Sequence, residues 1–142
     1  MVTLISGLVG GLVATIVMTG FMMGLGDDSP PPTAAFWAKY VGDGEPSAYM
    51  LQGMVLHLLY GIAAGGVFVA LLAPLGLGIT ALSGALLWGV VYGVVLFVIA
   101  AGFWMMIVLD MSATPMMAAM FLLFHLVYGV VLGGFLFYLP TL

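Results

Sequence analysis

Long apolar runs dominate this chain, and its polar residues gather between them. Four runs, near residues 4–25, 48–72, 79–109 and 115–139, are each long enough for a helix that crosses a bilayer, which needs about 20 residues. As a straight α-helix the third run would be about 46 Å long, against a hydrocarbon core of about 30 Å. We therefore expect it to tilt, to protrude or to break near residues 100–102. The pattern predicts four transmembrane helices.

The sizeable polar segment is the loop over residues 26–47, which we expect to lie outside the membrane. It begins with Asp27, Asp28 and three prolines, a combination that ends a helix. Residues 36–40 then combine aromatic rings with Lys39, which is typical of a segment at the level of the lipid headgroups. An even number of spans places both ends of the chain on one side of the membrane and the charged side chains on the other.

The composition excludes a soluble protein. Of the 142 residues, 65% are hydrophobic and only 4% are charged, whereas soluble domains carry about 25% charged residues. We expect a multi-pass integral protein of the cell or inner membrane with lipid as its first partner. With one basic residue, nucleic acid is excluded as a partner. Cysteine is absent, and no nucleophile, phosphate-binding or zinc motif occurs, so we predict no catalytic residue, no metal site and no enzymatic activity.

An internal repeat is the clearest pattern in the sequence. Residues 57–66, HLLYGIAAGG, recur as residues 125–134, HLVYGVVLGG, with His, Leu, Tyr and three Gly at identical spacing. Each copy contains two spans, so both copies keep the same orientation, as in transporters with parallel repeats. The predicted fold is an all-α integral membrane four-helix bundle of two parallel hairpin repeats. The repeats cover about 4–72 and 79–139 of a single domain over residues 1–142.

Small residues four positions apart recur in every span. In lipid no hydrophobic force draws helices together, so close backbone approach at such positions supplies the packing. We predict tight helix packing, with self-association of the bundle or assembly with other membrane subunits. The packing pairs are Gly7 and Gly11, Gly61 and Gly65, Gly89 and Gly93, and Gly129 and Gly133, with Gly20 and Gly24 as a further pair.

The two histidines are the main candidates for a functional site. His57 and His125 fall near the middle of their spans, on the faces that carry the glycines. Intramembrane ionisable residues are functional candidates by default. If the repeat brings the second and fourth spans together, the two imidazoles meet near its axis.

Three interpretations of the histidine pair stay open. In the first, each ring is neutral and bonds a group on a neighbouring helix. In the second, His57 and His125 are the two axial ligands of a b-type haem, with the glycines making room for its ring. In the third, the pair relays protons or binds a small ion or solute, with Gln52 and Asp110 along the access path.

Three other polar residues have simpler interpretations. Tyr60 and Tyr128 are expected to pack their rings at a helix interface and to bond their hydroxyls nearby. Asp110, with Ser112, is expected to cap the fourth span.

Several of these segments resemble the YagU-like group of small multi-span membrane proteins. The resemblance lies in GGLVATIVMT over residues 10–19, in HLLYG followed by a glycine pair over residues 57–66, and in SGALLWG over residues 83–89. The Asp/Pro-rich first loop and residues 104–110 depart from that group. The resemblance implies a four-span fold and transfers no catalytic residue. We expect a non-enzymatic protein without a resident cofactor, with haem binding or transport at the histidine pair as the alternatives.

Overall fold

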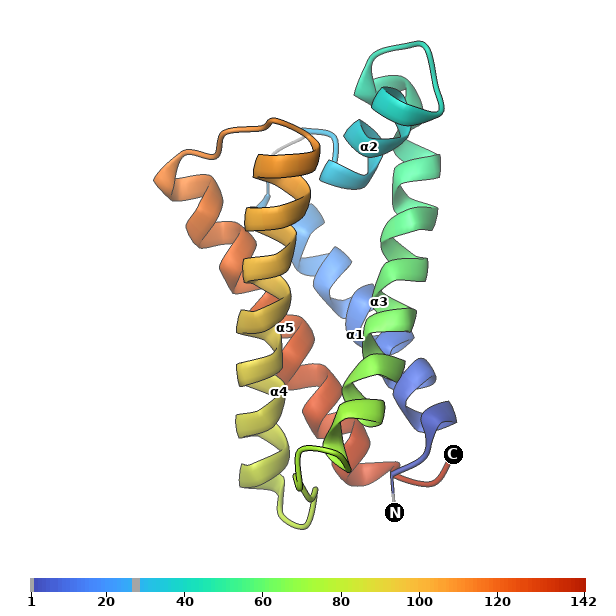
Figure 1. Ribbon diagram of the computed structural model, residues 1–142, viewed down its shortest axis with the longest axis vertical. Coiled ribbons are helices and arrows are strands. Elements are labelled where there is room, and N and C mark those ends of the chain that lie inside the picture. The colour runs from blue at the N-terminus through green and yellow to red at the C-terminus, as the bar shows by residue number, and fades with distance from the viewer. Residues whose placement is uncertain (1, 27–28) are drawn as a thin grey trace.

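All regular secondary structure in the described residues is helical. The computed structural model describes residues 2–26 and 29–142, so Asp27 and Asp28 of the predicted helix stop lie outside the described residues. No strand occurs within the described part (Figure 1). The elements in chain order are α1 (Leu4–Leu25), α2 (Pro32–Tyr40), the 3₁₀ turn η1 (Pro46–Tyr49), α3 (Met50–Leu72), α4 (Leu82–Val98), the π-helical segment η2 (Ile99–Val108) and α5 (Pro115–Tyr138).

Four helices are long and apolar enough to cross a membrane, which indicates a multi-pass membrane protein. They are α1, the continuous run of η1 and α3, the continuous run of α4 and η2, and α5. The predicted spans are confirmed as long apolar helices to within about three residues at each end. Proline supplies the first residue of α2, η1 and α5, a position where its missing N–H costs nothing.

Local hydrogen bonds define where the spans begin. The Thr3 hydroxyl accepts from the Ser6 backbone N–H at 3.1 Å, and the Ser6 hydroxyl accepts from the Thr3 N–H, so α1 starts with a capping box. At the start of α5 the Thr114 hydroxyl accepts from Met117 N–H at 3.2 Å. The prediction that Asp110 caps this helix is therefore wrong, because Asp110 lies four residues too early, at the turn between the two helices.

The third span changes its helix type instead of breaking. From Ile99 onwards the backbone follows a π-helix, and the Leu109 N–H donates to the Trp104 carbonyl five residues earlier at 2.9 Å. Such segments are rare and are usually single turns at functional sites. Here the wider turn runs for 10 residues, beside the cavity described below.

The bundle consists of two closely packed helix pairs that meet along one seam. Helix α1 packs on α3, α4 packs on α5, and α1 crosses α5 (Figure 1). The described residues of α3 and α4 make no comparable contact with each other. The apolar core contains residues of all four spans, and on α1 and α5 Ala14, Leu132 and Leu136 are fully buried. The α3–α4 side of the bundle is consequently the less closely packed one.

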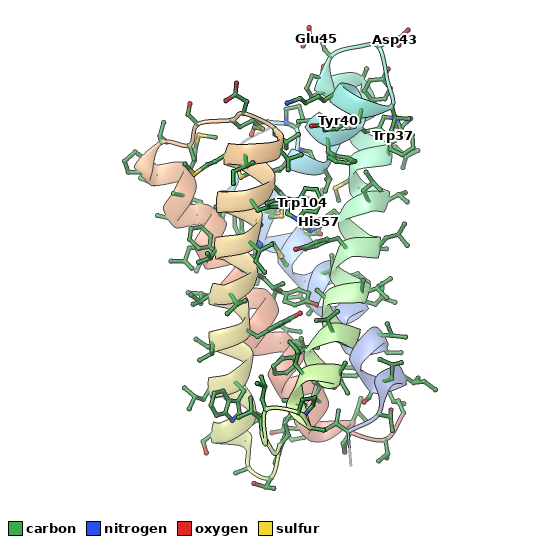
Figure 2. All side chains as sticks on the ribbon, in the orientation of Figure 1. Trp37, Tyr40, Asp43, Glu45, His57 and Trp104 are labelled. Carbon is green, nitrogen blue, oxygen red and sulfur yellow. The ribbon has the colours of Figure 1, made fainter. Side chains whose placement is uncertain are left out.

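Both chain ends lie at one end of the bundle. The Thr3 N–H and the Ser6 hydroxyl donate to the Pro140 carbonyl, each at 3.0 Å, and the Thr3 hydroxyl donates to the Leu142 carbonyl at 2.9 Å. The acidic residues Asp43 and Glu45 lie at the opposite end, with α2 (Figures 1 and 2). This arrangement agrees with an even number of spans.

Glycines allow close backbone approach in both helix pairs. A Cβ on Gly7 of α1 would lie 2.8 Å from the Gly65 carbonyl oxygen of α3. In the other pair, a Cβ on either Gly89 or Gly129 would collide with the carbonyl oxygen of the other. The remaining predicted packing glycines lie at the same two seams: Gly11, Gly61, Gly93 and Gly133. Gly20 and Gly24 differ, because no described atom lies within 4 Å of a Cβ built on them.

Candidate functional site

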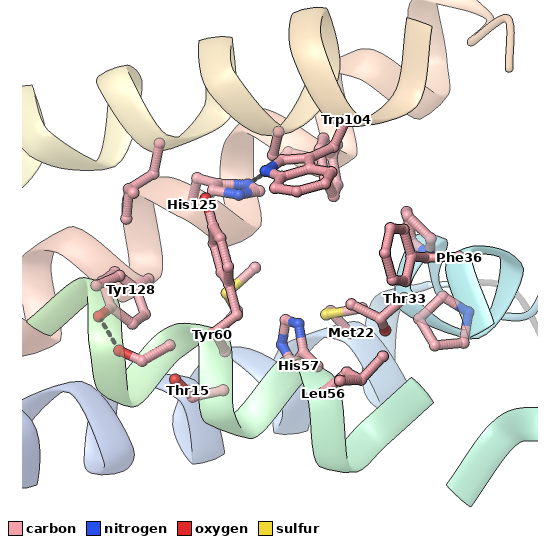
Figure 3. A pocket seen from close by; sticks show the side chains of 18 of the residues that line it. Thr15, Met22, Thr33, Phe36, Leu56, His57, Tyr60, Trp104, His125 and Tyr128 are labelled. Carbon is pink, nitrogen blue, oxygen red and sulfur yellow. Dashed lines mark hydrogen bonds between the residues drawn. The ribbon is translucent and has the colours of Figure 1, made fainter. Parts of the chain in front are cut away.

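A cavity of about 330 Å³ lies between α3 and α4, on the side where the backbones of these helices do not pack closely. Helices α1 and α5 line its inner wall, η2 continues the α4 wall, and α2 closes the end near the polar loop (Figure 3). Most of its lining is aliphatic, aromatic or methionine. The exceptions are seven residues whose side chains can form hydrogen bonds: Thr15, Thr33, His57, Tyr60, Trp104, His125 and Tyr128.

Both histidines line this cavity, from different helices. Figure 3 shows His57 on α3 and His125 on α5 at separate walls, with the Tyr60 ring reaching from α3 towards His125. The cavity thus brings the two predicted residues to one site. They lie across that space from each other, and the described residues contain no hydrogen bond between the two rings.

The two imidazoles have different surroundings. His125 is 5% exposed, and its Nδ1 lies 2.7 Å from the Phe121 carbonyl oxygen of its own helix. A carbonyl can only accept, so Nδ1 carries the proton and Nε2 of the neutral ring is an acceptor. The ring also packs edge-on against Phe121 and Phe97, with centroids 4.5 and 6.1 Å away. His57 Nε2, by contrast, is buried without a described hydrogen-bond partner. The expected bond to a neighbouring helix is thus replaced, at His125, by one within α5.

Tyrosine hydroxyls connect the second helix pair to α3. Tyr128 of α5 donates to the Gly61 carbonyl at 2.6 Å, and Tyr92 of α4 donates to the Ala64 carbonyl at 2.7 Å. Both rings are buried, which confirms the expected packed position for Tyr128. Tyr60 differs from its sequence counterpart in exposure: both line the cavity, but Tyr60 is 38% exposed and Tyr128 is buried.

Helix α2 forms a lid over one end of the cavity. Its Phe36 ring faces the Trp104 ring of η2 edge-on, with centroids 5.8 Å apart. Lys39 Nζ and the Tyr40 hydroxyl both donate to the Val108 carbonyl, at 2.8 and 3.0 Å. A cation at a helix C-terminus is electrostatically favourable. These contacts hold α2 against the end of η2.

The side of the cavity between α3 and α4 borders the surface that would face lipid. Leu59 and Tyr60 line the cavity and are also 57% and 38% exposed. The span helices that flank this side carry further exposed apolar side chains, among them Val55 on α3 and Ile99, the first residue of η2. An apolar molecule in the bilayer would therefore have access to the cavity from this side.

Two of the predicted pathway residues are not part of this site. Gln52 and Asp110 do not line the cavity. Asp110 is exposed in the turn before α5, with a left-handed φ of 55°.

Sequence reasoning missed the contributions of α2 and η2. Thr33 and Trp104 line the cavity, and Thr33 Oγ1 is buried without a described partner. Trp104 follows Ala100 and Leu96 at intervals of four, a spacing that places all three on one face of a helix. Thr33 had no such signal, since its position depends on how the loop folds back over the bundle.

The described residues contain no group of three or more His, Asp or Glu side chains that could hold a metal ion. A dihistidine site for a planar cofactor does not depend on such a group, since it needs only two protein ligands.

In comparisons with known proteins, no family model, no curated protein and no solved structure matches this chain.

Proposed function

We propose that this chain is a non-enzymatic membrane protein that binds a small apolar molecule in the cavity between α3 and α4. The observation that carries this proposal is the cavity itself. It has about 330 Å³ of space, a mostly apolar lining and a few hydrogen-bonding side chains at defined places. Sites for small molecules in proteins have this composition.

The contrast between the two sides of the bundle supports the proposal. Glycine seams close the α1–α3 and α4–α5 contacts to backbone distance, so the chain readily packs helices tightly. A cavity beside such seams is costly unless something fills it, because the side chains around an empty space lose contacts. A bound apolar molecule would restore those contacts.

The test is whether the protein retains a small molecule in this cavity. Native mass spectrometry of the purified protein, followed by organic extraction, should reveal a bound apolar species. Ala100→Phe would fill the cavity from a buried lining position and should abolish retention. Val98→Phe is the matched control, since Val98 is 59% exposed on the same helix and should leave retention unchanged. Absence of any retained molecule in the native protein, or equal retention in both variants, would reject the proposal.

A b-type haem protein is the second candidate, supported by the presence of His57 and His125 on one cavity. Each imidazole would supply one axial ligand to the iron. The visible absorption spectrum of protein expressed with ample haem tests this directly. We expect a Soret band that is lost in both His57→Ala and His125→Ala, whereas a colourless native protein would end this candidate.

Transport of protons, small ions or solutes stays a prediction with less support, because Gln52 and Asp110 do not line the cavity. A liposome flux assay that compares native protein with the double variant His57→Ala/His125→Ala tests it. Equal flux would remove this alternative.

Assembly with further copies or with other membrane subunits is part of our proposal. Gly20 and Gly24 are small residues on α1 with open space beside them, unlike the glycines at the two internal seams. The duplicated hairpin and the YagU-like resemblance belong to the same proposal, and the resemblance adds no activity to it. Size measurement of the solubilised protein in detergent should give a discrete oligomer or a complex, whereas a strictly monomeric particle would contradict assembly.

A further inference from the structure

Buried polar atoms without partners point to where the head of a ligand would lie. Three side-chain atoms in the described chain are buried with no hydrogen-bond partner: Thr19 Oγ1, Thr33 Oγ1 and His57 Nε2. Two of these, on Thr33 and His57, line the cavity. Buried polar groups in proteins are almost always paired, and an exception calls for an explanation such as an absent ligand or water.

These two atoms come from different helices at the lid end of the cavity. Thr33 belongs to the first turn of α2, and His57 belongs to α3 (Figure 3). A ligand hydroxyl can donate one hydrogen bond and accept another. The Thr33 hydroxyl can do both as well, whereas the neutral His57 Nε2 is either a donor or an acceptor, depending on the tautomer. A ligand hydroxyl therefore matches both groups whichever tautomer His57 adopts.

The charges of the cavity indicate a neutral head. None of its lining residues is Lys, Arg, Asp or Glu. Lys39, the one basic residue of the chain, is occupied at the Val108 carbonyl outside this cavity. A carboxylate or phosphate head would have to be buried without a lysine or arginine partner, which is expensive.

The body of the ligand follows from the access route. The lid contacts Phe36–Trp104 and Lys39–Val108 close the end near the polar loop. The side between α3 and α4 borders the lipid-facing surface at Leu59. A ligand that arrives through this side is dissolved in the bilayer, and its apolar body would occupy the apolar part of the cavity.

Resting on the proposed function, we infer that the cavity binds a neutral lipid-soluble alcohol, with its hydroxyl between His57 and Thr33 and its hydrocarbon body towards Tyr128. The head lies under the α2 lid, and the body points to the deeper, apolar end between the helices. This assigns Thr33 and His57 as the residues that select the head.

Brominated probes with one body and three heads test this inference. Bromine quenches nearby tryptophan fluorescence, and Trp104 lines the cavity. In a Trp37→Phe/Trp88→Phe background, Trp104 is the sole tryptophan. The probes are 10-bromodecan-1-ol, 10-bromodecanoate and 1-bromodecane, compared at equal mole fraction in nanodisc lipid. We expect saturable quenching that is strongest for the alcohol.

Variants then assign the head to its two partners. Thr33→Val and His57→Leu should each weaken binding of the alcohol by up to about tenfold, which corresponds to about 1.4 kcal/mol and one hydrogen bond. Neither should change binding of 1-bromodecane. Thr80→Val is the matched control, because Thr80 is exposed in the turn before α4 and should have no effect.

The outcomes separate this inference from the proposal beneath it. Equal saturable quenching by all three probes, or a preference for the carboxylate, overturns the hydroxyl inference and leaves apolar binding in place. No saturable quenching by any probe rejects the cavity as a binding site altogether. If a variant fails to fold, the ranking of the three probes in the protein that keeps Thr33 and His57 still tests the hydroxyl inference.

Discussion

The seam between α4 and α5 depends on glycine at position 129, and replacing it with alanine tests this dependence. A Cβ on Gly129 would collide with the Gly89 carbonyl oxygen and lie 3.3 Å from the Gly93 Cα. Both obstacles are backbone atoms, so they cannot rotate away as a side chain can. The variant Gly129→Ala must either separate the two helices or shift one along the other.

The size of the effect follows from two opposed contributions. Alanine is a better helix former than glycine by about 1 kcal/mol, a gain that applies at any glycine within α5. Forcing an extra carbon into a well-packed contact costs about 1–3 kcal/mol. Gly134→Ala supplies the comparison, because a Cβ there would meet only Leu86 Cδ2 at 3.9 Å, an ordinary contact. We expect Gly129→Ala to be less stable than Gly134→Ala by about 1–3 kcal/mol.

Unfolding by SDS in mixed micelles, followed by tryptophan fluorescence and circular dichroism, gives the required free energies. Both variants replace a glycine of α5 with alanine, so the change in helix propensity is the same in each. The difference between their free energies of unfolding therefore measures the packing at the seam. Equal stability of the two variants, or greater stability of Gly129→Ala, would refute the account of the α4–α5 contact.

Three further predictions concern single contacts. Tyr128→Phe should lower the free energy of unfolding by about 0.6 kcal/mol and at most about 1.7, the range for interhelical hydrogen bonds in membranes, whereas Tyr138→Phe, at an exposed ring, should not. Thr114→Ala should destabilise by about 1 kcal/mol through loss of the helix cap, with the same unfolding assay as the check; an unchanged midpoint would contradict the cap. Lys39→Ala should loosen the α2 lid, because it removes the hydrogen bond to the Val108 carbonyl. A cysteine placed at Thr33 in this cysteine-free chain should then react at least about twofold faster with a water-soluble maleimide. An unchanged rate would argue against a role of the Lys39–Val108 contact in holding the lid.

The spans could be predicted from the sequence because one physical requirement governs them. A helix that crosses a bilayer must be apolar over about 20 residues, and few segments of any chain satisfy that length. The capping threonine of α1 and the proline at the start of α5 then mark the ends. Close helix contacts can also be predicted from short sequence patterns, because only small residues permit them. Glycines do line the α1–α3 and α4–α5 seams.

The cavity could not be predicted, because it depends on which helix backbones do not approach each other closely. Periodicity identifies the face of a helix that packs, but it does not identify the partner. How closely α3 approaches α4 depends on how all the helices of the bundle pack, and so does the position of α2 over the cavity. Thr33 looked like an ordinary residue of a proline-rich loop for this reason. The π-helix of η2 likewise has no simple sequence signature, although it carries Trp104 into the cavity wall.

The two matched motifs differ in exposure beside the wide spacing between α3 and α4. Tyr60 and Tyr128 occupy the same place in their motifs and both line the cavity, yet Tyr128 is 2% exposed and bonded to α3, while Tyr60 is 38% exposed. Helix α1 packs on α5 along their backbones, whereas α3 and α4 meet through side chains, with the Phe68 and Tyr92 ring centroids 4.7 Å apart and the Tyr92 hydroxyl on the Ala64 carbonyl. Because the backbones of α3 and α4 are spaced apart beside His57, Tyr60 stays partly exposed and the space between the two helices stays open. The departure from symmetry, more than the histidine pair that the sequence displays, is therefore what provides room for a ligand.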